Sequence, residues 1–100
     1  MLYHGIQFDQ KSIAAFCQRH QISRLSLYGS ILRDDFRPDS DIDVLVEFTS
    51  DAKVSLFDLG GMLMELRDML GRDVDLRTPQ DLSRHFRDQV LHESKVLYAA

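Results

Sequence analysis

Residues 25–48, LSLYGSILRDDFRPDSDIDVLVEF, hold two segments of alternating apolar and polar side chains, joined by a loop rich in aspartate. The first alternation ends at Gly29-Ser30, which predicts a strand followed by a turn. The second covers residues 41–48, and successive side chains of a strand point to opposite faces. One face carries Ile42, Val44, Val46 and Phe48, and the other carries Asp41, Asp43, Leu45 and Glu47. The sequence therefore predicts a strand with Asp41 and Asp43 on the same side.

Two helices are predicted by their caps and by the spacing of their apolar residues. The first starts after Asp9, a good N-cap, and runs to about residue 20. The second starts after Ser55 and ends before Gly71, and its leucines recur every three or four residues, which favours core packing over partner binding. These leucines are Leu56, Leu59, Leu63, Leu66 and Leu70. Gly60-Gly61 interrupts this helix, which is tolerable if another backbone packs close to it.

The remaining segments complete an alternation of helices and strands. Residues 73–77 repeat the strand pattern, a last helical region begins at about residue 79, and residues 95–98 fit either an edge strand or a helical tail. This order predicts an α/β (α+β) fold, with a small mixed sheet of three or four strands and helices packed on one face. The length predicts a single domain over residues 1–100.

The composition excludes several classes of protein. A net charge of -4 argues against a broad nucleic-acid surface. No stretch approaches the roughly 18 consecutive apolar residues of a membrane span, and the N-terminus lacks the pattern of a secretory signal, which predicts a cytoplasmic protein. Cys17 is the only cysteine, so no disulfide forms within the chain, and its place beside Ile13 and Phe16 predicts a buried thiol.

The aspartates of the two predicted strands form a candidate site. If these strands pair side by side, Asp75 joins Asp41 and Asp43 on one sheet face. Three carboxylates there suit hard cations, with Mg²⁺ favoured because it needs few protein ligands. Two such ions roughly 4 Å apart would activate a hydroxyl and stabilise the leaving oxygen in a phosphoryl or nucleotidyl transfer. Gly29-Ser30 fits a phosphate-binding turn, and the guanidinium of Arg33 suits phosphate.

Several charges near this site have a simpler interpretation. Arg33 is equally suited to a surface ion pair with Asp34 or Asp39. The remaining aspartates are interpreted as solvated turn or rim charges, namely Asp34, Asp35, Asp39 and Asp73. Spacing alone does not separate Asp73 from Asp75, because both point to the same face of the predicted strand.

The motifs in this order resemble the minimal nucleotidyltransferase family of the DNA polymerase beta superfamily. They lie in LYGSILRDDFRPDSDIDVLVEF and in RDVDLRT, where the VDL match selects Asp75. The resemblance implies a nucleotidyltransferase fold in which Asp41 and Asp43 bind the metal ions. Asp75 is then the third ligand and accepts the proton of the acceptor hydroxyl. Gly29 and Ser30 would hold the terminal phosphates of ATP, while AMP moves to the acceptor and pyrophosphate leaves.

The same resemblance implies a partner, because minimal nucleotidyltransferases are paired with HEPN proteins, typically RNase toxins. The chain would then be the antitoxin, transferring AMP from ATP to a hydroxyl of the toxin, with tyrosine the favoured acceptor. Two alternatives stay open at this point. The chain could block its partner by occlusion alone, or it could be the catalytic subunit of a small-molecule nucleotidyltransferase whose acceptor pocket a helical partner completes.

Overall fold

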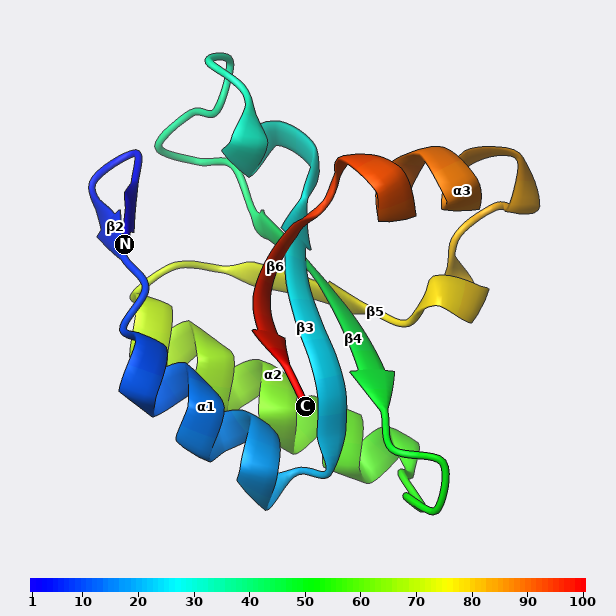
Figure 1. Ribbon diagram of the computed structural model, residues 1–100. Helices are drawn as coiled ribbons and strands as arrows, with labels where there is room; N and C mark the ends of the chain where they lie inside the picture. Colours follow the sequence, from blue (N-terminus) through cyan, green and yellow to red (C-terminus); the bar gives the residue numbers. More distant parts are fainter.

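The computed structural model describes residues 1–100 and contains a four-stranded sheet with the order β5-β4-β3-β6 (Figure 1). The strands are β3 (Ile22–Tyr28), β4 (Ile42–Phe48), β5 (Val74–Arg77) and β6 (Lys95–Ala99). β4 runs parallel to β5, whereas β3 is antiparallel to both β4 and β6. The sheet is therefore mixed, as predicted, and the C-terminal segment is an edge strand rather than a helical tail.

Two helices cover one face of this sheet (Figure 1). They are α1 (Gln10–Arg19) and α2 (Leu56–Leu70). Asp9 caps the start of α1, and Ser55 and Asp58 form the predicted capping box at the start of α2. Gly71 ends α2 in a left-handed conformation, with φ 68°, which a residue without a Cβ adopts at little cost. Local capping chemistry thus fixes both helices where the sequence predicts them.

The main core lies between the sheet and these two helices and is a single cluster of 16 buried residues. β4 contributes Ile42, Val44 and Val46, which are the predicted apolar face of that strand. Cys17 of α1 is fully buried, and burial raises the pKa of its thiol to about 12. The apolar face of β4 and the buried thiol are therefore both confirmed.

The N-terminal turn of α2 departs from the predicted packing. Met62 and Leu66 are buried, but Leu56 is 87% exposed and Phe57 is 93% exposed. The prediction that Leu56 packs in the core is wrong, because the first turn of α2 extends past the edge of the core. No backbone packs against Gly60-Gly61 either, since a Cβ added to either glycine would meet no atom within 4 Å.

The opposite face of the sheet is not open along its whole length. Leu45 of β4 and Ser26 of β3 are Cα partners, and each is only 1% exposed. The chain turns back after β5, and the short 3-10 turn η2 (Pro79–Asp81) contacts β4. The middle of this sheet face is therefore covered rather than open to solvent. The predicted last helix is split into η2 and α3 (Arg84–Glu93), and α3 has no buried residue.

A small N-terminal hairpin is the one element that the sequence does not predict. Its strands are β1 (Leu2–Tyr3) and β2 (Ile6–Gln7), which are too short to show an alternating pattern. The hairpin and the residues after it bury Ile6 and Phe8 against the core.

None of the helices has the length and apolar character that crossing a membrane requires.

Candidate active site

The pairing of β4 with β5 brings the predicted aspartates together. Asp43 and Asp75 are Cα partners in the parallel pair, and Tyr28 of β3 is the Cα partner of Asp43 on the other side. Side chains at paired positions share a face, so these three residues form a row across three strands. Asp41 lies one residue before β4 and is close enough to influence the charge of Asp43. The strand pairing on which the candidate site depends is therefore present.

Asp73 lies outside this row. It precedes β5, its side chain is 70% exposed, and it forms an ion pair with Arg67 of α2 at 3.0 Å. Its backbone carbonyl accepts from the N–H of Ile42 at 2.9 Å, which aligns β5 with β4. Asp73 is thus a rim charge, as interpreted from the sequence, and its backbone helps to set the register of Asp75.

Gly29 touches the row from the end of β3. Its φ is 76°, in the left-handed region that favours glycine. A Cβ on Gly29 would lie 3.3 Å from the Asp43 Cγ and would overlap Oδ2 of the same carboxylate. The turn that follows is η1 (Gly29–Leu32), which begins with the Gly29-Ser30 pair. The absence of a side chain at position 29 therefore leaves room for the carboxylate of Asp43.

The position of Asp43 and Tyr28 in this row disfavours the charged forms of both side chains. Burial raises the pKa of Asp43, and the neighbouring carboxylates of Asp75 and Asp41 raise it further, while Arg77 and Arg33 partly offset this effect. Burial, followed by the charge of Asp43, raises the pKa of Tyr28 to about 12. The fold thus holds a carboxylate where negative charge is disfavoured, which is the condition that a bound cation would relieve.

The raised pKa of Asp43 predicts how stability depends on pH. Because the folded pKa lies above the ordinary value of 3.8, folding favours the protonated form, and stability is lost as pH rises from that value through the folded pKa. With a chelator present, we expect Asp43→Asn to raise Tm at pH 7 and to have no effect at pH 3. Thermal unfolding across this range, with exposed Asp39→Asn as the control, tests this. A lower Tm for Asp43→Asn at neutral pH would contradict it.

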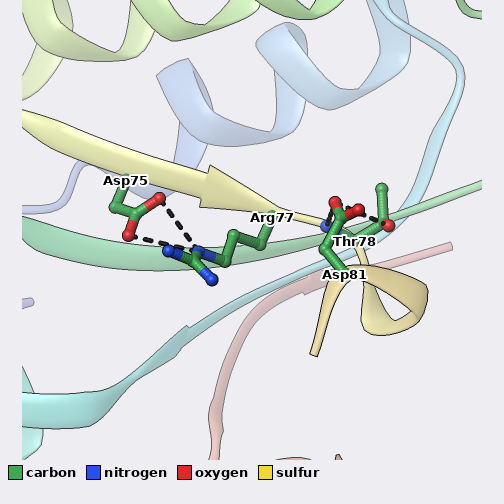
Figure 2. A network of polar contacts seen from close by, with 4 residues as sticks. All are labelled: Asp75, Arg77, Thr78 and Asp81. Atoms are coloured by element: carbon green, nitrogen blue, oxygen red, sulfur yellow. Dashed lines mark hydrogen bonds and ion pairs between the residues drawn. The ribbon is translucent and has the colours of Figure 1, made fainter. Parts of the chain in front are cut away.

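Arg77 is a neighbour of the site that sequence reasoning missed. Its Nε donates to both Oδ1 and Oδ2 of Asp75 at 3.2 Å, as Figure 2 shows. This hydrogen bond, together with the charge of Asp75, raises the pKa of the guanidinium. The only signal in the sequence is the spacing in RDVDLRT, since residues two apart in a strand share a face. Beyond Arg77, Asp81 accepts from the N–H and hydroxyl of Thr78, both at 3.0 Å (Figure 2).

The oxygen donors suit a hard cation by their chemistry. Asp41, Asp43 and Asp75 offer only carboxylate oxygens, the ligands that Mg²⁺ prefers. As they stand, no three His, Cys, Asp or Glu side chains are arranged as a ready metal cage, and Arg77 engages both oxygens of Asp75. The residues therefore fit magnesium by donor type, and a side-chain rearrangement that frees Asp75 is needed for it to serve as a ligand.

A cavity of about 550 Å³ lies beside Gly29. Strand β3 and turn η1 line one side, and α3 lines the other; the lining residues are Tyr28, Gly29, Leu32, Arg33, Phe86, Gln89, Val90 and Glu93. Arg33 is exposed and forms an ion pair with Asp35 at 3.2 Å, rather than with Asp34 or Asp39 as the alternative interpretation expected. This contact leaves Arg33 at the edge of both the cavity and the Gly29-Ser30 turn.

Comparison with known proteins matches the chain to a family. The family described as "Nucleotidyltransferase domain" matches residues 10–98, which include every candidate residue of the site. A Methanocaldococcus jannaschii protein to which protein adenylyltransferase activity is provisionally assigned is 35% identical, over 85% of this chain and 89% of that protein. A solved structure provisionally described as a minimal nucleotidyltransferase is 33% identical, with a TM-score of 0.71 and 85% of both chains covered.

Two toxin–antitoxin complexes share the fold at lower identity. One, with AMP-PNP, is 21% identical with a TM-score of 0.72, and the match covers 93% of this chain and 75% of that chain. The other contains a tri-AMPylated HEPN toxin of Shewanella oneidensis with its MNT antitoxin, at 22% identity and a TM-score of 0.64, covering 91% and 70%. The family match over residues 10–98 and the identity to the archaeal relative agree with the mixed sheet and its aspartates. This chain belongs to the nucleotidyltransferase domain family and is a nucleotidyltransferase.

Proposed function

We propose that this nucleotidyltransferase moves AMP from ATP to a hydroxyl of a HEPN-domain toxin, and that it acts as the antitoxin of that partner. The observation that carries the proposal is the position of Asp43, which faces Asp75 across the parallel pair and lies against Gly29. Nucleotidyl transfer requires a phosphate-binding turn next to carboxylates that can hold cations, because the cations that neutralise the reacting phosphate must meet it at one place.

The proposed reaction assigns a role to each residue. The acceptor oxygen forms a bond to the α-phosphorus of ATP, the bond to the β-phosphate oxygen breaks, and pyrophosphate leaves. Asp75 accepts the proton of the acceptor hydroxyl, while Gly29 and Ser30 hold the terminal phosphates and Arg33 contacts them. Asp41, Asp43 and Asp75 would hold two magnesium ions, which would supply neutralisation of the phosphate charges and a lower pKa for the acceptor hydroxyl.

The cavity beside Gly29 supports nucleotide binding next to the aspartates. It joins apolar side chains of α3 and η1 to the Gly29 turn, so a flat base and the phosphates that follow it can be held together. Phe86, one of the lining residues, is 62% exposed and would supply an aromatic ring on which a base could stack.

The partner is proposed from the relatives. We propose that residues 1–100 form one catalytic domain, because a single core of 16 residues joins the sheet, α1 and α2. The acceptor hydroxyl is proposed to belong to another molecule. The AMPylated HEPN toxin and the AMP-PNP complex among the structural neighbours support a HEPN protein as acceptor and ATP as donor. Tyrosine is the proposed acceptor and the cytoplasm the proposed location.

The position of the label in ATP tests this function directly. The chain is incubated with Mg²⁺, the product of the adjacent gene as the proposed HEPN partner, and ATP radiolabelled at either the α- or the γ-phosphate. We expect label on the partner only from the α-position, because AMP is transferred and pyrophosphate is released. Label from the γ-position would indicate phosphorylation instead and would overturn the proposal. Label recovered only on a small molecule would favour a small-molecule nucleotidyltransferase.

Asp75 and Asp73 form a matched pair for a further prediction. Loss of a positioned general base typically lowers the rate by roughly 10²–10⁴-fold, so we expect Asp75→Asn to reduce the single-turnover rate of AMP transfer within that range. Asp73→Asn should stay near the wild-type rate, because its carboxylate is exposed and faces Arg67 rather than the row. Single-turnover transfer to the partner at saturating ATP measures both. Equal losses in the two variants would contradict the role given to Asp75.

A further inference from the structure

Arg77 blocks the carboxylate that is proposed to serve as the third metal ligand. Its Nε lies 3.2 Å from both oxygens of Asp75, so no oxygen of that side chain is left unengaged (Figure 2). Arg77 and Asp75 are two residues apart on β5 and therefore point to the same face of the sheet. The guanidinium of Arg77 thus already supplies a positive charge next to the carboxylates of the row.

The guanidinium of Arg77 is held less firmly than those of two other arginines. Arg72 donates to the carbonyl oxygens of Arg37 and Ser40, and Arg87 donates to those of Pro79 and Leu82. Arg77 bonds to Asp75 only, and its side chain is 48% exposed. An exposed ion pair of this kind contributes little to stability, so the guanidinium can leave Asp75 at small cost.

The charges around Asp75 favour replacement of Arg77 by a stronger cation. Asp43 is the Cα partner of Asp75, and Asp41 acts on Asp43 from the start of the same strand. Arg77 and Arg33 both act on Asp43, so two guanidinium groups stand near three carboxylates and a net negative charge remains. A divalent ion carries twice the charge of the guanidinium in a smaller volume and would interact with several carboxylates at once.

We infer that Arg77 is a displaceable counter-ion of Asp75. In the cation-free chain Arg77 occupies both carboxylate oxygens, and it gives them up when a divalent cation enters the row. Arg77 is therefore a positioning residue, which weakens cation binding by competing with the cation for Asp75. The role of Asp75 as a ligand in catalysis rests on the proposed function, whereas the competition between Arg77 and a cation concerns cation binding alone.

Binding of Mn²⁺ to the full chain without nucleotide tests the inference. The free ion is followed by electron paramagnetic resonance during titration of wild type and Arg77→Gln. An exposed pair contributes up to about 1 kcal/mol, so we expect Arg77→Gln to bind Mn²⁺ roughly 2–5-fold more tightly. In an Asp75→Asn background, Arg77→Gln should not increase the affinity for Mn²⁺, because residue 75 then has no carboxylate to release.

Arg67→Gln is the matched control. Arg67 is 46% exposed and pairs with Asp73 at 3.0 Å, so the substitution removes an equal charge from a similar ion pair outside the row. We expect its Mn²⁺ affinity to stay at the wild-type value. An equal gain in Arg67→Gln would show an effect of net charge alone and would overturn the inference.

Three other results would also overturn the inference. They are unchanged or weaker Mn²⁺ binding by Arg77→Gln, a gain that survives in the Asp75→Asn background, and no saturable binding by any variant. The titration contains neither ATP nor the partner. The result of the titration therefore does not depend on AMP transfer. A failure of the proposed function would appear only in the AMP-transfer assay.

Discussion

Asp41→Asn and Asp43→Asn are each expected to lower AMP transfer to the partner by at least roughly 10³-fold, because each removes a carboxylate proposed to hold the cations that neutralise the phosphates. An amide keeps the shape of the side chain but loses the negative charge that holds a cation. The fold should be retained, since Asp41 is exposed and Asp43 is half-buried at a position where its charge is disfavoured. Rates are measured by single turnover with α-labelled ATP.

Asp34→Asn and Asp39→Asn are the matched controls for this prediction. Both residues are exposed in the loop between η1 and β4, and no ion pair involves either of them. Each control removes one carboxylate from the same acidic segment, so transfer should stay near the wild-type rate. A comparable loss in the controls would indicate that the total charge of the loop matters, rather than the two positions at the start of β4.

Gly29→Ala is expected to abolish most of the transfer activity by displacing Asp43. The added Cβ would overlap the carboxylate Oδ2 of Asp43, so this side chain or the turn must move. A displacement of about 1 Å at a reacting centre can reduce the rate by roughly 10²-fold, and we expect a loss of at least this size. The positive φ of 76° adds a conformational cost of about 1–2 kcal/mol to folding.

Gly5→Ala separates these two effects. Gly5 has a φ of 78°, nearly that of Gly29, but a Cβ at position 5 would meet no atom within 4 Å. Both variants should therefore lose similar stability from backbone strain, whereas only Gly29→Ala should lose activity. Chemical denaturation measures the first quantity and the transfer assay measures the second. Full activity in Gly29→Ala, or equal activity losses in the two variants, would contradict the contact between the turn and Asp43.

The parts of the fold that depend on local chemistry could be predicted from the sequence. The caps at Asp9 and Ser55 and the stop at Gly71 act within one helical turn, so their residues identify them. The alternation in residues 41–48 likewise fixes which side chains of β4 face the core. The direction of Asp41 and Asp43 follows from the same pattern, because side chains of one strand alternate strictly.

The parts that depend on contacts distant in sequence could not be predicted. The pairing of Asp43 with Asp75 requires a parallel arrangement of β4 and β5, which no local pattern specifies. The alternation in β4 places Leu45 on the polar face, but η2 contacts β4 and Leu45 is buried. The contact between Gly29 and the Asp43 carboxylate arises only once β3 and β4 pair.

Comparison of intact masses with neutralisation of the partner tests the central claim most directly. The HEPN protein is incubated with Mg²⁺, ATP and either wild type or Asp43→Asn, then weighed and assayed for its own activity. We predict that wild type adds the mass of at least one AMP group and silences the partner, whereas Asp43→Asn does neither. Silencing by Asp43→Asn with no change in partner mass would contradict enzymatic transfer and establish occlusion.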